Sequence, residues 1–171
     1  TLSLKIKSKS PIISNLLSQT TRWEYMFKVE RVLSNIVRPL RHKILRPNLP
    51  FEDSILPEDD FLSSAHFIVK NNGNIVSVAS VYKEYFEAIP TRKGYRLRGM
   101  ATEKKEQGKG FGTVVLKGAI HYLKNETDAD IIWCNARVSA FGFYEKMGFI
   151  IVGDEFDLSN IGPHKTGYIE V

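Results

Sequence analysis

The stretch Gln107-Gly108-Lys109-Gly110-Phe111-Gly112 decides how the rest of the chain is organised. Three glycines at alternate positions give a backbone that bends sharply and lets a ligand come close. Residues 95–102 before it read as a strand, and the apolar residues after it recur at helical spacing. A strand, a glycine loop and a helix in this order aim free backbone N–H groups at a phosphate. The charge of Lys109 could reach the same anion.

Two common glycine motifs do not fit this loop. A dinucleotide fingerprint needs a glycine where Thr113 stands, and a P-loop needs Ser or Thr where Gly110 follows Lys109. The pattern that fits is Gln-x-x-Gly-x-Gly. It resembles the pyrophosphate loop of the GNAT superfamily of acyl-CoA-dependent N-acyltransferases. By itself, the loop is also compatible with a tight turn that only caps a helix.

A second motif lies downstream, in residues 136–149. Ala140, Phe143, Tyr144, Gly148 and Phe149 form the pattern Ala-x-x-Phe-Tyr-x-x-x-Gly-Phe. This pattern resembles the signature of GNAT enzymes that joins their fifth strand to their fourth helix, at the expected distance after the glycine loop. The resemblance extends over about residues 27–171, and the segments 133–137 and 161–164 resemble a small subgroup of the superfamily.

The resemblance implies a fold of the α+β (α/β) class. We expect a GNAT-like mixed, mostly antiparallel sheet of about seven strands with helices on both faces, in which strands four and five splay apart and acyl-CoA lies between them. Patterning places a helix from about residue 38, with Pro39 in its first turn. The expected strands are 27–33, 65–70, 75–82, 95–102, 130–136, 149–153 and 165–171, with a hairpin turn at 71–74.

The resemblance also implies a binding site for acetyl-CoA. Backbone groups of residues 100–102 would meet the pantetheine arm and the thioester, and the glycine loop would hold the pyrophosphate. The residues expected at the cofactor are Met100, Ala101, Thr102, Gln107, Gly108, Lys109, Gly110, Phe111, Gly112, Asn135, Arg137 and Ala140. Arg137 stands where the family often has asparagine, so its contact is an open question between a CoA phosphate and an acidic acceptor.

Two catalytic candidates stand out. Tyr144 occupies the position of the family's usual general acid, and its alternative role is that of a core tyrosine. His164 is one candidate base, because its unperturbed pKa is about 6.5, and a water chain is the alternative base. The alternative role of His164 is to fix the closing strand. The strand positions where many relatives carry a glutamate hold Arg96, Arg98, Asn135 and Arg137 instead.

Composition limits the remaining possibilities. A length of 171 residues suits one domain, and the single cysteine, Cys134, favours a reducing, cytoplasmic setting and a buried structural thiol. We expect no metal, because the histidines lack ligand spacing. Residues 1–25 are rich in lysine and serine, a composition like that of a transit peptide, and read as a disordered or appended N-terminal extension, which leaves residues 26–171 as the domain. The basic balance is largely a property of that extension, so nucleic acid and membrane partners are not expected.

Three functions compete at this stage. The first is transfer of an acetyl group to a small-molecule or peptide amine, and the second is a non-catalytic acyl-CoA-binding domain of the same fold. The third, a phosphate-binding nucleic-acid module, lacks exposed aromatic platforms. A homodimer is possible. By the two-residue period, residues 96, 98, 100 and 102 should share one face toward the cleft, unless the arginines pair with acids of the 52–60 loop such as Asp59 or Asp60.

Overall fold

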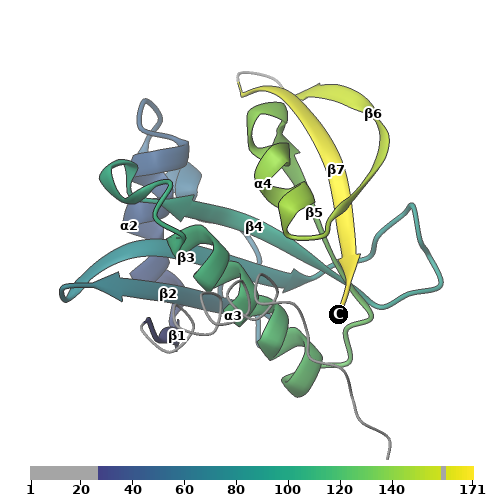
Figure 1. Ribbon diagram of the computed structural model, residues 1–171, viewed down its shortest axis with the longest axis horizontal. Helices are drawn as coiled ribbons and strands as arrows, with labels where there is room; N and C mark the ends of the chain where they lie inside the picture. Colours follow the sequence, from purple (N-terminus) through teal and green to yellow (C-terminus); the bar gives the residue numbers. More distant parts are fainter. Residues whose placement is uncertain (1–26, 159–160) are drawn as a thin grey trace, which may run out of the picture.

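The computed structural model describes residues 27–158 and 161–171, so the expected N-terminal extension lies outside the described part. Seven strands form one mixed sheet in the order β1-β2-β3-β4-β5-β7-β6 (Figure 1). The strands are β1 Val29–Val32, β2 Ala65–Asn71, β3 Asn74–Lys83, β4 Gly94–Thr102, β5 Ile131–Arg137, β6 Ile150–Leu158 and β7 Gly162–Glu170. The expected sheet is confirmed, although β6 and β7 run further than their apolar residues indicate, because the polar end of β6 pairs with β7.

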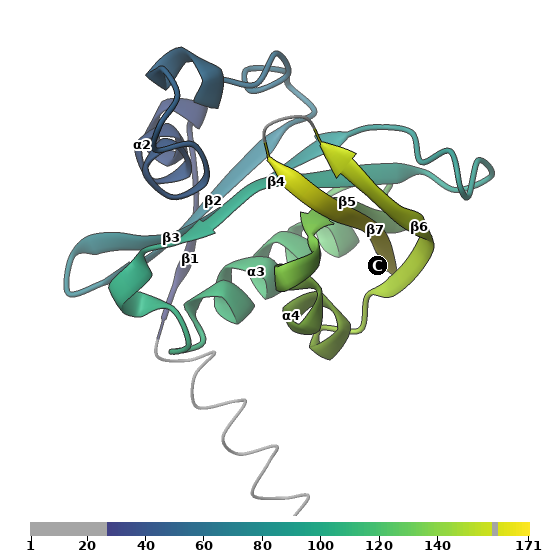
Figure 2. The same ribbon diagram turned by 90° about the horizontal axis from the view of Figure 1, so that it is seen from above.

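Helices cover both faces of the sheet, as expected. The helix α2, Ser34–Leu45, lies on one face, and α3, Phe111–Glu126, lies with α4, Phe141–Lys146, on the other (Figure 2). The alternation of β3 explains this arrangement: Val78 packs in the apolar cluster under α2, whereas Ala79 and Val81 pack in the larger cluster under α3. A strand that is apolar on both faces must be covered on both.

The sheet opens between its two central strands. The strands β4 and β5 are parallel and pair only through Gly94–Ile131, Tyr95–Ile132 and Arg96–Trp133. Beyond Arg96 they part, while β4 continues to Thr102 and β5 to Arg137. Backbone groups on the facing edges are therefore left without a strand partner, and such groups need another hydrogen-bonding partner.

A bulge in β4 overturns the expectation that residues 96, 98, 100 and 102 share a face. Arg98 pairs with Ser80 and Ala101 with Val78, so one extra residue lies on β4 at Gly99, whose φ is 60°. Arg98 and Ala101 thus face α2, whereas Met100 packs in the cluster under α3. A strict period of two assigns these side chains wrongly because a bulge shifts it by one residue.

The first helix begins one turn earlier than its sequence indicates. Pro39 lies inside α2 and not in its first turn. Tertiary contacts hold this early turn in place: the Ser34 hydroxyl donates to Asp60 at 2.5 Å, and Arg38 donates to Asp59 at 3.1 Å. These partners lie in the loop before β2, and a local pattern does not reveal them.

A buried charged network fixes α2 to the sheet. Arg41 is 3% exposed and Asp59 is 3% exposed, and they pair at 2.9 Å. The Tyr82 hydroxyl donates to Asp59 at 2.6 Å, and Arg41 donates to the Ser80 hydroxyl at 2.8 Å. Removing one partner of such a pair leaves a buried charge and costs about 3–5 kcal/mol. This network determines where the end of α2 lies over β4.

Substitution of Gly99 should test the coupling of the bulge to this network. A Cβ there would lie 2.5 Å from Arg41 Nε, and a non-glycine residue at positive φ costs about 1–2 kcal/mol. Gly153→Ala is the control, since its φ is 71° and a Cβ there meets nothing within 4 Å. We expect the melting temperature to fall by roughly 6 °C or more for Gly99→Ala and by roughly 2–6 °C for the control. Equal losses would contradict the coupling.

Stability should fall as the solution becomes acidic. Burial of His66, which accepts from the Ser80 hydroxyl through Nδ1 and donates to the Asp59 carbonyl through Nε2, lowers its pKa. The unfolded state therefore binds the extra proton first, and stability is lost as pH falls below about 6.5. Urea unfolding at pH 7.5 and pH 5 measures this. In His66→Gln, the free energy of unfolding should differ less between pH 7.5 and pH 5 than in the native protein. An unchanged difference would contradict the role of His66.

Candidate active site

The glycine loop forms a left-handed corner at the start of α3. Gly108 has φ of 77° and Gly110 has φ of 90°, and a Cβ at either would meet no atom within 4 Å. Their lack of a side chain is therefore required by the backbone conformation and keeps the surface open. Val114 donates to the Gly110 carbonyl at 3.1 Å, which leaves the N–H groups of residues 111–113 without a helical partner.

A groove of about 520 Å³ runs from this loop to the gap between β4 and β5. The Gln107 amide donates to the Thr102 carbonyl at 3.0 Å and ties the loop to the end of β4. The residues of the expected cofactor site that line this glycine-loop groove are Met100, Ala101, Thr102, Gln107, Gly108, Gly110, Phe111, Gly112 and Ala140. The groove thus unites most of the expected set, with open N–H groups at one end and strand edges at the other.

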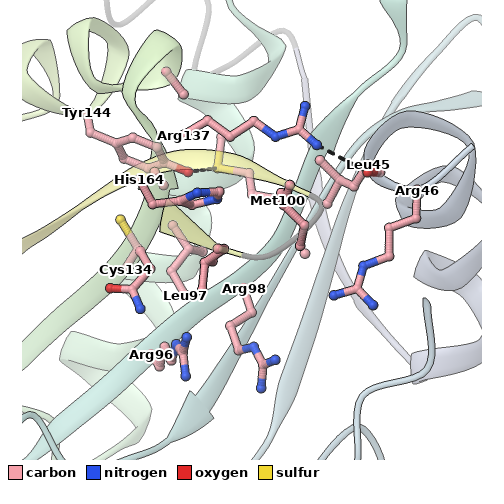
Figure 3. Close-up of a pocket in the computed structure, with 16 residues that line it drawn as sticks. Leu45, Arg46, Arg96, Leu97, Arg98, Met100, Cys134, Arg137, Tyr144 and His164 are labelled. Carbon is pink, nitrogen blue, oxygen red and sulfur yellow. Dashed lines mark hydrogen bonds between the residues drawn. The ribbon is translucent and has the colours of Figure 1, made fainter. Parts of the chain in front are cut away.

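A second cavity of about 250 Å³ lies at the gap itself and is lined by four arginines (Figure 3). We call it the arginine cavity after Arg46, Arg96, Arg98 and Arg137. Asn135 and His164 also line it. Leu45, Met100, Ala140 and Tyr144 line both the groove and this cavity, so the two spaces share a wall.

Tyr144 stands at that shared wall. Its hydroxyl donates to Met100 Sδ at 3.6 Å, a weak acceptor, and the side chain is 8% exposed (Figure 3). Burial raises the pKa of Tyr144, so the phenol stays protonated at neutral pH. The ring packs edge-on against Phe143 and Phe149 of the same sequence motif. A rigid, neutral O–H donor therefore lies where the groove meets the cavity.

His164 is held by a local contact. Its Nδ1 lies 2.7 Å from the Gly162 carbonyl, which can only accept, so Nδ1 carries the proton in the neutral ring. The other nitrogen, Nε2, is then the acceptor. This contact suits either of the roles expected for His164. Asn135 is fixed similarly, since its side-chain oxygen accepts from the Thr166 hydroxyl at 2.7 Å.

Two expected cofactor residues make other contacts here. Lys109 pairs with Glu106 at 3.1 Å and does not line the groove. Arg137 donates to the Leu45 carbonyl at 3.3 Å, which joins the end of β5 to the end of α2 across the gap. The acids Asp59 and Asp60 bind α2, and it is Glu58 that reaches Arg98, at 3.5 Å.

Cys134 packs in the cluster under α3 and also borders the arginine cavity. It is 1% exposed, and burial raises the pKa of its thiol to about 12, so it is a structural thiol, not a nucleophile. Within residues 27–158 and 161–171, no three His, Cys, Asp or Glu side chains are grouped to hold a metal ion. None of the helices described is long and apolar enough to cross a membrane.

Comparison with known proteins agrees with this geometry. Residues 37–149 match the model of the acetyltransferase (GNAT) family. The chain belongs to this family. It is 34% identical over 143 residues to the uncharacterised N-acetyltransferase YitI of Bacillus subtilis, covering 84% of this chain and 95% of YitI.

Solved structures share the fold at low sequence identity. The crystal structure of Escherichia coli ElaA superposes with a TM-score of 0.66 at 16% identity, covering 84% of this chain and 99% of ElaA. An IAA acetyltransferase from Bacillus cereus gives 0.66 at 18% identity, covering 85% and 99%. A variant of the Vibrio cholerae spermidine N-acetyltransferase SpeG gives 0.63 at 15% identity, covering 85% and 94%.

The sequence did not reveal every residue that lines the site. Leu45 and Arg46 reach it from the end of α2, and Leu158 and Ile161 from the β6–β7 hairpin. The only local signal at Arg46 is the following proline, which indicates the end of a helix and not a cavity wall. Packing of α2 over β4 brings these residues to the gap.

Proposed function

We propose that this GNAT family member is an N-acyltransferase that moves the acetyl group of acetyl-CoA to an amine by direct attack. The observation that carries the proposal is the shared wall at Tyr144, where the glycine-loop groove and the arginine cavity meet at the parted strands. Family membership supports the acyl transfer, and the glycine loop supports a donor with a pyrophosphate.

The residues present fit acetyl-CoA. The open N–H groups of residues 111–113 and the two left-handed glycines would hold the pyrophosphate, because a helix N-terminus favours negative charge. The unpaired edge of β4 near Met100 would bind the amides of the pantetheine arm and the thioester carbonyl. Acetyl-CoA supplies an activated acyl group and a thiolate leaving group.

Tyr144 would donate its phenolic proton toward the departing sulfur. Burial raises the pKa of the phenol, and the same dry surroundings make a thiolate more basic. The pKa values of the proton donor and of the leaving thiol therefore change in the same direction. His164 Nε2 would accept the proton that the attacking amine loses, since Nδ1 already donates to the Gly162 carbonyl.

One observation favours a non-catalytic acyl-CoA-binding domain as the second candidate. Within residues 27–158 and 161–171, no carboxylate lines the arginine cavity, so an acidic base is missing from its wall. The neutral Tyr144 donor and His164 favour turnover. Release of free thiol from acetyl-CoA in the presence of a panel of amines decides between the two.

We expect Gly110→Asp to weaken acetyl-CoA binding at least tenfold. The new carboxylate would occupy the open face of the loop and oppose the charge of the pyrophosphate. Gly153→Asp is the matched control, because it places the same side chain at a similar φ of 71° outside the groove. Calorimetric titration measures both affinities. An unchanged affinity for the loop variant would remove the loop from the binding site.

We expect Tyr144→Phe to retain acetyl-CoA affinity and to lower turnover on the best amine of the panel by about a hundredfold, the usual scale for loss of a positioned acid. Tyr95→Phe is the control, since Tyr95 is an equally buried tyrosine on the part of β4 that still pairs with β5. Equal turnover of Tyr144→Phe and the native protein would leave the hydroxyl without a catalytic role.

A further inference from the structure

The charged side chains that line the arginine cavity are all basic. Four guanidinium groups line it, from the segment after α2, from β4 and from β5, and among the described residues no Asp or Glu lines it (Figure 3). Catalysis by Tyr144 does not require this charge. A cavity built for a cationic acceptor would carry acids in its wall, because like charges repel strongly where water is excluded.

Two of the four guanidinium groups are tied to backbone oxygens. Arg137 donates to the Leu45 carbonyl at 3.3 Å, and Arg46 donates to the Asp53 carbonyl. A carbonyl oxygen accepts a hydrogen bond but carries no net charge, so both side chains keep their positive charge at the cavity wall. They raise the electrostatic potential inside the cavity without filling it.

Arg96 is positioned by two contacts and retains an unused donor. It pairs with Glu84 at 2.8 Å and lies over the Trp133 ring at 4.7 Å. Its Nε is buried and has no hydrogen-bond partner. A buried donor of this kind is costly unless a further acceptor reaches it.

Arg98 makes the longest polar contact of the four arginines. Its ion pair is with Glu58, at 3.5 Å between Nη1 and Oε2, and that oxygen is itself buried without a hydrogen-bond partner. This separation is longer than that of a charge-assisted hydrogen bond, which is about 2.7–2.9 Å. Burial lowers the pKa of Arg98, and the neighbouring charge of Arg96 lowers it further, whereas the charge of an added anion would act in the opposite direction.

Building on the function proposed above, we propose that the acceptor is a small amine that also carries a carboxylate or phosphate, and that Arg98 and Arg96 bind this anionic group. Guanidinium groups bind such anions through two parallel hydrogen bonds. Glu58 is the internal competitor that the anion displaces from Arg98.

The size of the acceptor follows from the volume of the cavity. Arg98 lines the arginine cavity together with Met100, which contacts the Tyr144 hydroxyl, and the volume of this cavity is about 250 Å³. The acceptor must therefore be a small molecule. The neighbouring hollow beyond Asn135 carries Glu84 and Glu87, so it does not share the positive lining of the arginine cavity.

The test compares acceptors that differ in one charge. Glycine with glycinamide and phosphoethanolamine with ethanolamine form the carboxylate and phosphate arms, and spermidine is the polycation. Free-thiol release from acetyl-CoA gives kcat/KM for each, and calorimetry gives acetyl-CoA affinity in parallel. We expect the anionic member of at least one pair to react at least tenfold faster than its neutral partner, and spermidine to react more slowly than either.

Two variants should change kcat/KM for the anionic acceptor in opposite directions. Arg98→Gln should lower kcat/KM for the anionic member at least tenfold and leave its neutral partner within twofold. Glu58→Gln should raise kcat/KM for the anionic member, because it removes the competing charge. Arg92→Gln, which loses a surface ion pair with Glu170 outside the cavity, should change neither.

Several outcomes would overturn the anion site. These are faster acylation of spermidine or of the neutral partners, equal losses for both partners in Arg98→Gln, or no acylation of any anionic amine by a protein that binds acetyl-CoA. A fall in kcat/KM with Glu58→Gln would assign Glu58 to the amine instead. Failure to bind acetyl-CoA would refute the function proposed above, and calorimetry separates that failure from the others.

Discussion

The site depends on the early end of pairing between β4 and β5. Two parallel strands in the middle of a sheet would normally bond along their whole length, but here pairing stops after Arg96 and Trp133. The freed edges, the groove and the arginine cavity all follow from this separation. The cost of unpaired backbone groups is offset only if a ligand or water bonds to them, which supports the gap as the place where a ligand is proposed to bind.

The bulge at Gly99 gives the separated strand a different role on each face. Before the bulge Arg98 faces α2, and after it Met100 turns toward α3 and the Tyr144 hydroxyl. Without the extra residue, the arginines and Met100 would lie on one face. The positive φ of Gly99 and the guanidinium of Arg41 against it show that the bulge and the buried network depend on each other.

The network around Asp59 connects fold stability to the site. Asp59 accepts from the Tyr82 hydroxyl, Arg41 and Arg38. Burial alone would raise the pKa of Asp59, yet the hydrogen bond from Tyr82 and the charge of Arg41 lower it. The network holds the end of α2 over β4, and the neighbouring loop residue Glu58 lies beside Arg98. A charge cluster on the α2 face of the sheet therefore lies next to the residues that line the arginine cavity.

The sequence alone determined the architecture and the groove. The glycine spacing, the apolar repeat of α3 and the motif around Tyr144 are local patterns, because each arises from backbone conformation or from one helix face. The expected burial of Cys134 is also confirmed, since the thiol packs in the cluster under α3. The bulge in β4, the early start of α2 and the contribution of Arg46 were decided by the tertiary structure. Each depends on partners distant in sequence: Arg41 at Gly99, Asp60 at Ser34, and the packing of α2 over β4.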